Sequence, residues 1–394
     1  MLARRLVATF VVVSAGLLVG ELAGVHELGE SVPFLLLATA LLAIGLYGST
    51  YGIDNAEVRQ NAGVVIRAVT VGVVLKSGLI AGVMYAVFRD PAYIVIGVAV
   101  AQIDPLSVAV MRHRVRLSER AKAILSAWSS FDDPVTAILA VMLASAAAAM
   151  GTVDGGGTGG GVVLGGVAGV GVGLVGNAVV LGVLAAIWFG LRRISARTPG
   201  RDPDRAAGNA DRGGLSRRLA LLAVVVLVAV AAVAVYWVLL LGLAAAGLFY
   251  RPGLAAVLNR LVAVAFWVAL VMLGLVLADG VRWWPGLVLG FAAFGAQVVV
   301  GGLLTRSLPA DRARLSFSQQ NGITAVILAL LLENVFPGTV AVVAPAVLVV
   351  NVLHLVSNRV LDAVADGTSR WSPSPAPNRV WQHPAASRIT RETR

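Results

Sequence analysis

Long apolar stretches recur along the whole sequence and leave few options for its fold. Hydropathy and loop charge separate about twelve of them, near 6–25, 32–48, 64–88, 93–111, 121–150, 162–191, 219–236, 238–250, 261–278, 284–304, 315–332 and 340–360. A helix of roughly 20 apolar residues crosses a bilayer and satisfies its own backbone groups on the way. We therefore predict an all-α, multi-pass membrane protein whose partner is the lipid bilayer. The segment 219–250 is short for two spans, but a single span would break the charge pattern of the loops.

The composition agrees with this class and argues against others. Hydrophobic residues make up 58% of the chain and charged residues only 13%, whereas soluble proteins carry about 25% charged residues. The absence of cysteine excludes disulfides and thiolate metal sites. The formal net charge of +11 does not indicate nucleic-acid binding, because the basic residues gather in short loops and in the tail. The positive-inside rule places these segments, and both termini, in the cytoplasm.

The third to fifth apolar stretches have counterparts in the tenth to twelfth. By loop charge the third enters from the cytoplasm and the tenth from outside, so the two triplets are inverted repeats. Inverted repeats with interrupted helices at the midplane are typical of secondary transporters. Segment 192–218 is expected to be a cytoplasmic linker, and the Ser-, Pro- and Arg-rich segment 363–394 a disordered cytoplasmic tail.

Two adjacent carboxylic acids lie in the middle of the fifth apolar stretch, in Phe131-Asp132-Asp133-Pro134. An Asp at the centre of a membrane helix costs roughly 2.5–3.5 kcal/mol, and such residues usually line ion pathways or proton relays. A carboxylate can hold an alkali cation and a proton in turn, because its surroundings tune its proton affinity. We predict that Asp133 is the main ion and proton ligand. Asp132 is expected to be a second carrier or an ion-pair partner.

A third acid lies near the middle of the fourth stretch, in Gln102-Ile103-Asp104-Pro105. The proline interrupts the helix, since it lacks an N–H group and disfavours helix in the preceding residue. Two roles for Asp104 remain open. It either joins the ion ligands or neutralises the positive ends of helices that meet at the break. Backbone carbonyls freed at Ile103–Asp104 are further candidate ligands.

A lysine stands at the centre of the third stretch. Lys76 is expected to pair with Asp132 or Asp133 and to release the acid when the ion binds. Lysine suits this role because, unlike arginine, it can lose its charge when buried. Gln297 occupies the mirror-related place in the tenth stretch.

Amide side chains occupy the eleventh and twelfth stretches. Ser318-Gln319-Gln320-Asn321-Gly322 is a polar interruption early in the eleventh. We predict that Gln320 and Asn321 compensate charges and freed backbone groups there, since amides both donate and accept hydrogen bonds. Asn351, near the centre of the twelfth stretch, is a candidate supporting residue.

These motifs, taken together and in order, resemble the cation/proton antiporter superfamily, the sodium/proton exchangers, over roughly residues 30–362. Ile103-Asp104-Pro105 is similar to the superfamily's Thr-Asp-Pro, and the segment 129–134 to its Asn-Asp or Asp-Asp signature. The segments 319–325 and 336–338 are similar to its second broken helix and the loop that follows. Two departures stand out. Ile103 removes a hydroxyl, and Gln297 replaces a basic residue whose role Lys76 would take over.

The resemblance implies a sodium/proton antiporter fold with two broken crossing helices, an elevator-like mechanism and a homodimer. It assigns 61–150 and 281–362 to the two core repeats. It assigns 1–60 and 151–280 to the dimerisation scaffold. Asp133 matches the superfamily's ion-binding acid and Asp132 its variable neighbour.

We therefore expect an antiporter of a prokaryotic plasma membrane that exchanges protons for Na⁺, or for K⁺ or Li⁺, in pH homeostasis. Such a protein needs no cofactor and is not an enzyme. Two alternatives remain. The same fold can couple Na⁺ to the uptake of an organic anion, although no cluster of substrate-binding residues is visible. An intramembrane aspartyl protease also uses two membrane acids, but its Gly-x-Gly-Asp setting is missing.

Overall fold

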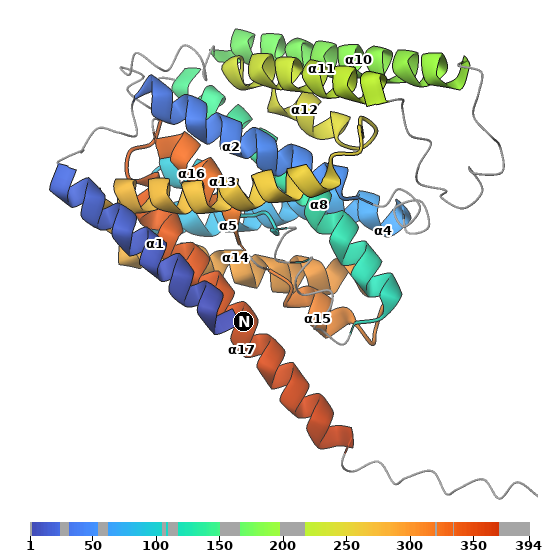
Figure 1. Cartoon of the computed structure of the whole chain (residues 1–394). Coiled ribbons are helices and arrows are strands. Elements are labelled where there is room, and N and C mark those ends of the chain that lie inside the picture. Colours follow the sequence, from blue (N-terminus) through green and yellow to red (C-terminus); the bar gives the residue numbers. More distant parts are fainter. Residues whose placement is uncertain are drawn as a thin grey trace, which may run out of the picture.

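A computed structural model describes residues 2–23, 31–53, 62–104, 108, 117–149, 166–197, 217–319, 321–333 and 335–369 (Figure 1). Helices are the regular secondary structure of the described residues, as predicted. Its longer helices are α1 (Leu2–Ala23), α2 (Val32–Tyr51), α5 (Val73–Phe88), α8 (Glu119–Ala149), α10 (Gly166–Arg197), α11 (Arg217–Tyr236), α13 (Ala255–Val276), α14 (Trp283–Leu304), α16 (Ile323–Glu333) and α17 (Thr339–Ser369). The shorter ones are α4 (Ala62–Arg67), the π-helix η2 (Ala68–Gly72), α6 (Ala92–Ala99), α12 (Leu240–Ala246), the 3₁₀ helix η4 (Leu277–Asp279) and α15 (Arg312–Ser316).

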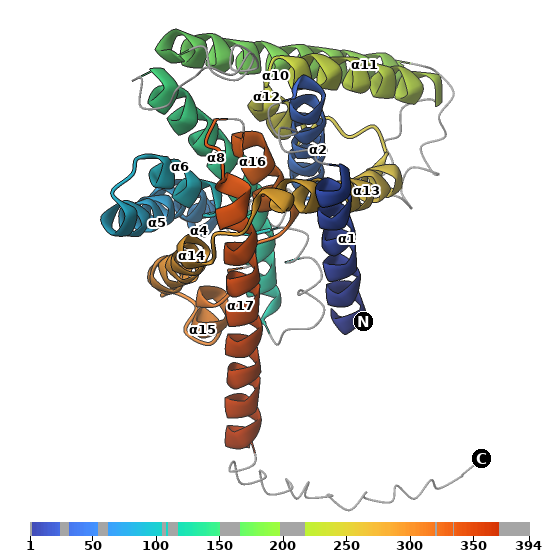
Figure 2. The same cartoon turned by 90° about the vertical axis from the view of Figure 1, so that its left-hand side faces the viewer.

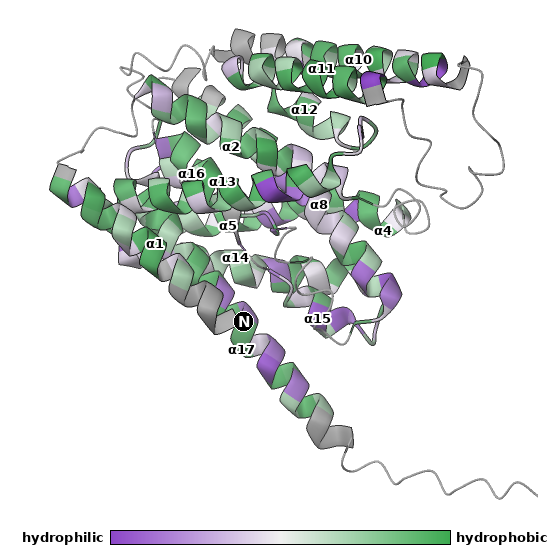
Figure 3. Ribbon diagram, in the orientation of Figure 1, coloured by the Kyte–Doolittle hydropathy of each residue, from purple (hydrophilic) through white to green (hydrophobic). Residues whose placement is uncertain are grey.

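The surface of these helices suits a lipid environment. Within the described residues, seven helical stretches are long and apolar enough to cross a membrane. Hydrophobic residues cover most of the ribbon in Figure 3, and hydrophilic ones gather on α15 and at the ends of α8 and α17. Large apolar side chains such as Leu222, Val225 and Val228 on α11 are exposed. The chain is therefore a multi-pass membrane protein.

The helices form two groups that meet in the centre of the molecule (Figure 2). In one group α1 packs along α13, α2 packs against α12 and α13, and α10 packs against α11 and α12. In the other, α5 packs against α6 and α14, and α14 packs against α15 and α17. α8 and α16 join them, since α8 contacts α6 and α10 while α16 contacts α17 and α2. The predicted division into core and scaffold follows the same lines and stays a prediction.

A close crossing of two glycines holds α1 against α13. A Cβ atom on Gly274 would overlap the backbone of Val13, and one on Gly16 would overlap the backbone of Val271. Only glycine allows two helix backbones to approach this closely in a membrane. This contact fixes α1 along α13.

The segment 237–250 corrects one sequence-based expectation. A span was assigned to 238–250, but α12 covers only seven residues, or about 10 Å of a hydrocarbon core of about 30 Å. The segment nevertheless folds back along α11, because the Tyr250 hydroxyl donates to the Ala223 carbonyl near the start of α11 (2.8 Å). Arg251 then donates to the Ile53 carbonyl at the end of α2 (2.8 Å). The return path therefore combines a short helix with turns.

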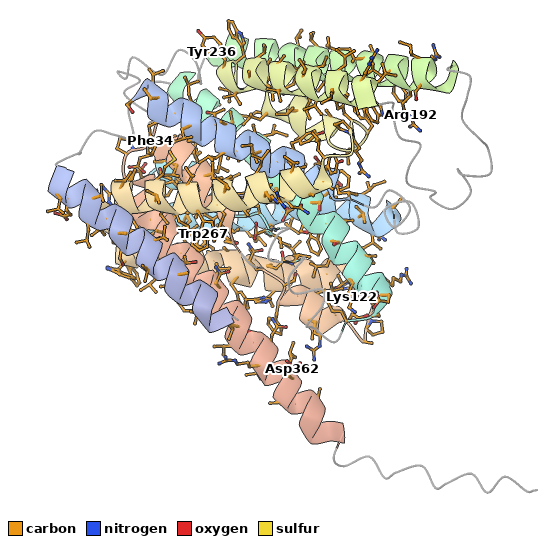
Figure 4. All side chains as sticks on the ribbon, in the orientation of Figure 1. Phe34, Lys122, Arg192, Tyr236, Trp267 and Asp362 are labelled. Atoms are coloured by element: carbon orange, nitrogen blue, oxygen red, sulfur yellow. The ribbon has the colours of Figure 1, made fainter. Side chains whose placement is uncertain are left out.

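Two basic residues of the helix ends lie on the same side of the molecule. Figure 4 places Lys122 and Arg192 on one side of the molecule and Phe34 and Tyr236 on the opposite side. The assignment of a cytoplasmic face by the positive-inside rule stays a prediction.

Candidate ion-binding site

Two interrupted helices cross in the middle of the fold. α6 ends at Ala99 and leaves residues 101–104 without helical structure, while residues 317–319 and 321–322 separate α15 from α16. Side chains of the second break satisfy carbonyls of the first. Asn321 Nδ2 donates to the Val100 carbonyl (2.9 Å) and Gln319 Nε2 to the Gln102 carbonyl (2.7 Å). The crossing therefore has the internally satisfied backbone that a break inside a membrane requires.

The first acid of α8 forms a buried ion pair at this crossing. Lys76 Nζ on α5 lies 2.7 Å from Asp132 Oδ2, and both side chains are 0% exposed. The Ile103 backbone N–H donates to the same oxygen (2.9 Å). Lys76 Nζ also lies 5.9 Å from the centre of the Trp128 ring, within the range of a cation–π contact. Asp132 is thus held by a cation and by the end of the first broken helix.

The second acid has neutral partners instead. Thr324 in the first turn of α16 donates its hydroxyl to Asp133 Oδ2 (2.8 Å). The Gln102 amide nitrogen lies 3.2 Å from Asp133 Oδ1 in the orientation in which the amide oxygen accepts from the Ala325 N–H (2.7 Å). Asp133 is also 0% exposed. Neither donor carries a charge, so neither cancels the charge of the carboxylate.

The third acid lies against the second break. Asp104 is buried, and a Cβ atom on Gly322 would overlap its carboxylate, so this position requires glycine. Asp104 therefore sits where the two breaks touch, which suits both roles left open by the sequence.

Other predicted residues support the second break. Asn351 Nδ2 on α17 donates to the Asn321 carbonyl (2.9 Å). Gln297 Nε2 on α14 lies 3.4 Å from the Leu315 carbonyl and 3.3 Å from Ser318 Oγ. Gln320 falls outside the described residues.

The structure thus brings Lys76, Asp132, Asp133, Asp104, Ile103 and Asn321 together at the crossing, with Gln297 and Asn351 beside it. Gln102 and Thr324 were not singled out as site residues, although both stand inside the motifs. The sequence contains no signal for the contact partners of a threonine in an apolar helix or of an amide that precedes an acid. Only the fold brings Thr324 to an acid that lies 191 positions away.

Comparison with known proteins identifies the class of this fold. No family model matches the sequence. A search of curated proteins finds no match either. Among solved structures, the fold matches that of a membrane antiporter. One match is the sodium proton antiporter MjNhaP1 from Methanocaldococcus jannaschii at pH 8, with a TM-score of 0.59, 14% identity, and 89% of this chain and 92% of that chain covered. A second structure of MjNhaP1, from an electron-microscopy map, matches with a TM-score of 0.53 and 15% identity over 95% of this chain and 100% of that chain.

The described helices therefore have the sodium/proton antiporter fold, which confirms the predicted all-α fold, while the count of about twelve spans stays a prediction. Both matched structures are of a transporter and not of an enzyme.

Proposed function

We propose that this protein is a secondary antiporter that exchanges protons for Na⁺, or for K⁺ or Li⁺, by alternating access. One observation carries the proposal. At the crossing of the two broken helices of an antiporter fold, two adjacent buried acids have unlike partners, a lysine for Asp132 and neutral donors for Asp133.

The difference between the two acids assigns their tasks. A buried carboxylate needs a compensating charge, because moving an ion out of water costs on the order of several kcal/mol per ion even after the protein relaxes. Asp132 receives this charge from Lys76. Asp133 receives hydrogen bonds from Thr324 and Gln102, which carry no charge, so a proton or an alkali cation completes it. Competition between the two for Asp133 produces exchange.

Lys76 is the responsive partner in this proposal. A cation that enters beside Asp133 also faces the neighbouring Asp132 and weakens the Asp132–Lys76 ion pair. Lysine can then change its contact or lose its proton, which arginine cannot do. Lys76 therefore takes the role of the basic residue that the resemblance places on the tenth apolar stretch, where this chain has Gln297.

Alternating access follows from the two groups of helices. The core, α4 to α8 with α14 to α17, moves against α1, α2 and α10 to α13, and the site faces each side in turn. The protein acts as a homodimer in a prokaryotic plasma membrane with both termini in the cytoplasm, where it serves pH homeostasis. The side of the molecule that carries Lys122 and Arg192 is then the cytoplasmic one (Figure 4).

Exchange by proteoliposomes tests the function. Vesicles holding the purified protein and a pH-sensitive dye are challenged with Na⁺, K⁺ or Li⁺. The wild type is expected to move protons against at least one of these cations. Asp133→Asn and Asp133→Ala are expected to abolish exchange, whereas Asp362→Asn, at a surface residue paired with Arg314, should leave it unchanged. Retained exchange without the Asp133 carboxylate would refute the site.

The pH dependence tests the competition. Cation binding to an acid releases its proton, so affinity falls as the pH is lowered. The half-saturating Na⁺ concentration should rise on acidification by up to about tenfold per pH unit, the limit for one competing proton. A half-saturating concentration that stays constant with pH would mean that protons and cations use separate sites.

A further inference from the structure

The carboxylate of Asp133 alone offers too few oxygen ligands for an alkali cation. Among the described residues, no three Asp, Glu, His or Cys side chains gather to hold a metal together. The side chain at position 103, next to the acids, belongs to an isoleucine and carries no oxygen. Hard cations take oxygen ligands, and several of them. Neutral oxygens must therefore complete the site.

We infer that the hydroxyls of Thr324 and Thr136 complete the cation site at Asp133 and set its selectivity among alkali cations. This inference rests on the proposed function and adds two ligands that neither the motifs nor the comparisons assign. Each threonine is supported by a separate observation.

Thr324 brings its oxygen from the second repeat. Its side chain is 2% exposed, and its hydroxyl donates to Asp133 Oδ2 at 2.8 Å. A hydroxyl has one donor and two acceptor lone pairs. In the absence of a cation it donates to the carboxylate. With a cation beside that carboxylate, the proton turns away and a lone pair faces the ion.

Thr136 offers an unused oxygen on α8 itself. Its side chain is 0% exposed, and its hydroxyl has no hydrogen-bond partner among the described residues. Two other buried threonines bond to the carbonyl four residues earlier, Thr39 to that of Leu35 (2.7 Å) and Thr305 to that of Gly301 (2.6 Å). Thr136 makes no such bond, although buried hydroxyls are nearly always paired.

The helical position of Thr136 directs it to the site. Successive residues turn by about 100°, so Thr136 lies at about 40° from Asp132 and about 60° from Asp133, one turn further along the helix. It therefore stands between the two acids. Asp132 Oδ1, on the neighbouring acid, likewise has no hydrogen-bond partner among the described residues.

Two serine hydroxyls of this part of α8 donate within their own helix. Ser129 Oγ donates to the Ser126 carbonyl at 3.1 Å and Ser130 Oγ to the same carbonyl at 2.8 Å. They satisfy their own helix. Thr136 and Thr324 are thus the threonines whose oxygens the geometry leaves for the ion.

The test replaces each hydroxyl by a methyl group of the same shape. In proteoliposomes, Thr136→Val and Thr324→Val are expected to raise the half-saturating Na⁺ concentration by on the order of tenfold or more, the scale on which neighbours of a metal site change its affinity. They should also change the ratio of Na⁺, Li⁺ and K⁺ activities, which a general loss of packing would not do. Thr136→Ser and Thr324→Ser keep the oxygen and should restore both properties. Thr39→Val, which removes a buried hydroxyl from α2, is the matched control.

Direct binding separates this inference from the function. Detergent-purified protein is titrated with radioactive ²²Na⁺, and variants are first checked by size exclusion and thermal unfolding. Weaker binding by both valine variants, with the control unchanged, supports the two ligands even if no exchange is seen. Wild-type affinity and selectivity in both valine variants, or no ²²Na⁺ binding by the wild type, overturns the inference. If the wild type exchanges cations and both valine variants have its affinity and selectivity, the proposed function is supported and the assignment of the two threonines as ligands is rejected.

Discussion

The two segments predicted to be inverted repeats anchor their broken helices with different chemistry. In the first, α8 anchors the break at residues 101–104 through a carboxylate, since Asp132 accepts from the Ile103 N–H (2.9 Å) and from Lys76 (2.7 Å). In the second, α17 anchors the break at residues 317–322 through neutral groups. Asn351 donates to the Asn321 carbonyl (2.9 Å), and His354 Nδ1 lies 2.7 Å from the Phe317 carbonyl, which makes that nitrogen the donor.

The comparison extends to the neighbouring helices. Lys76 on α5 and Gln297 on α14 are both 0% exposed. Lys76 meets an acid, whereas Gln297 meets a carbonyl and a hydroxyl at long range, 3.4 and 3.3 Å. Anchoring a broken helix therefore does not need charge. The proposed function gives the charges of the first predicted repeat a role in ion exchange, and the second predicted repeat serves as an internal control for it.

Removing the lysine should have the largest effect. Lys76→Gln leaves Asp132 charged and unpaired, and breaking a buried ion pair costs about 3–5 kcal/mol. We expect a loss of stability of this order at neutral pH, measured by denaturant titration in micelles. The loss should shrink as the pH falls, because protonation discharges Asp132. Exchange by this variant should show a shifted pH profile or an altered charge movement.

The double variant is the control for this prediction. Lys76→Gln combined with Asp132→Asn removes both charges and should recover most of the lost stability, since an ion pair replaced as a whole costs far less than a broken one. Equal losses in the single and double variants would show that the two charges do not act together. An unchanged pH profile and charge movement in Lys76→Gln would remove Lys76 from the mechanism.

Much of this site could be predicted from the sequence because its signals are local. The length of an apolar stretch locates a span, and proline and glycine locate the breaks in the helices. An acid within an apolar stretch indicates a candidate site residue. The partner of Lys76 was left open between Asp132 and Asp133, because that choice depends on the rotation of α5 about its axis. The π-helical turn Ala68–Gly72 lies just before α5 and changes that rotation. Hydropathy contains no signal for such a turn.

Other features were missed for physical reasons. Thr324 and Thr136 look like packing residues, since a threonine in an apolar helix usually bonds to its own backbone. Segment 238–250 was expected as a span because its composition is apolar, but α12 ends at Ala246 and turns complete the return. Apolar composition specifies burial in the membrane and not the regularity of the helix.

Weakening the neutral anchor should have an intermediate effect. Asn351→Leu removes the hydrogen bond that α17 gives to the Asn321 carbonyl, and a buried carbonyl that loses its donor costs about 1–3 kcal/mol. We expect lower stability of this order and slower exchange, without a shift of the pH profile, because no charge is altered. Val356→Leu, at an exposed position of the same helix, is the control. A shifted pH profile in Asn351→Leu would contradict the view that the second repeat is electrically silent.

The smallest effect is expected at the mirror-related position of the lysine. Gln297→Leu removes two long hydrogen bonds together with an amide oxygen that has no partner among the described residues. Ser318 Oγ still donates to the Leu315 carbonyl (2.6 Å), so neither group loses its last contact. Replacing a weakly bonded polar group by an apolar one of similar size is nearly neutral, within about 1 kcal/mol. Stability and the half-saturating Na⁺ concentration should therefore stay close to those of the wild type. A loss as large as that of Lys76→Gln would mean that Gln297 takes part in the ion chemistry, and the contrast between a charged and a neutral repeat would fail.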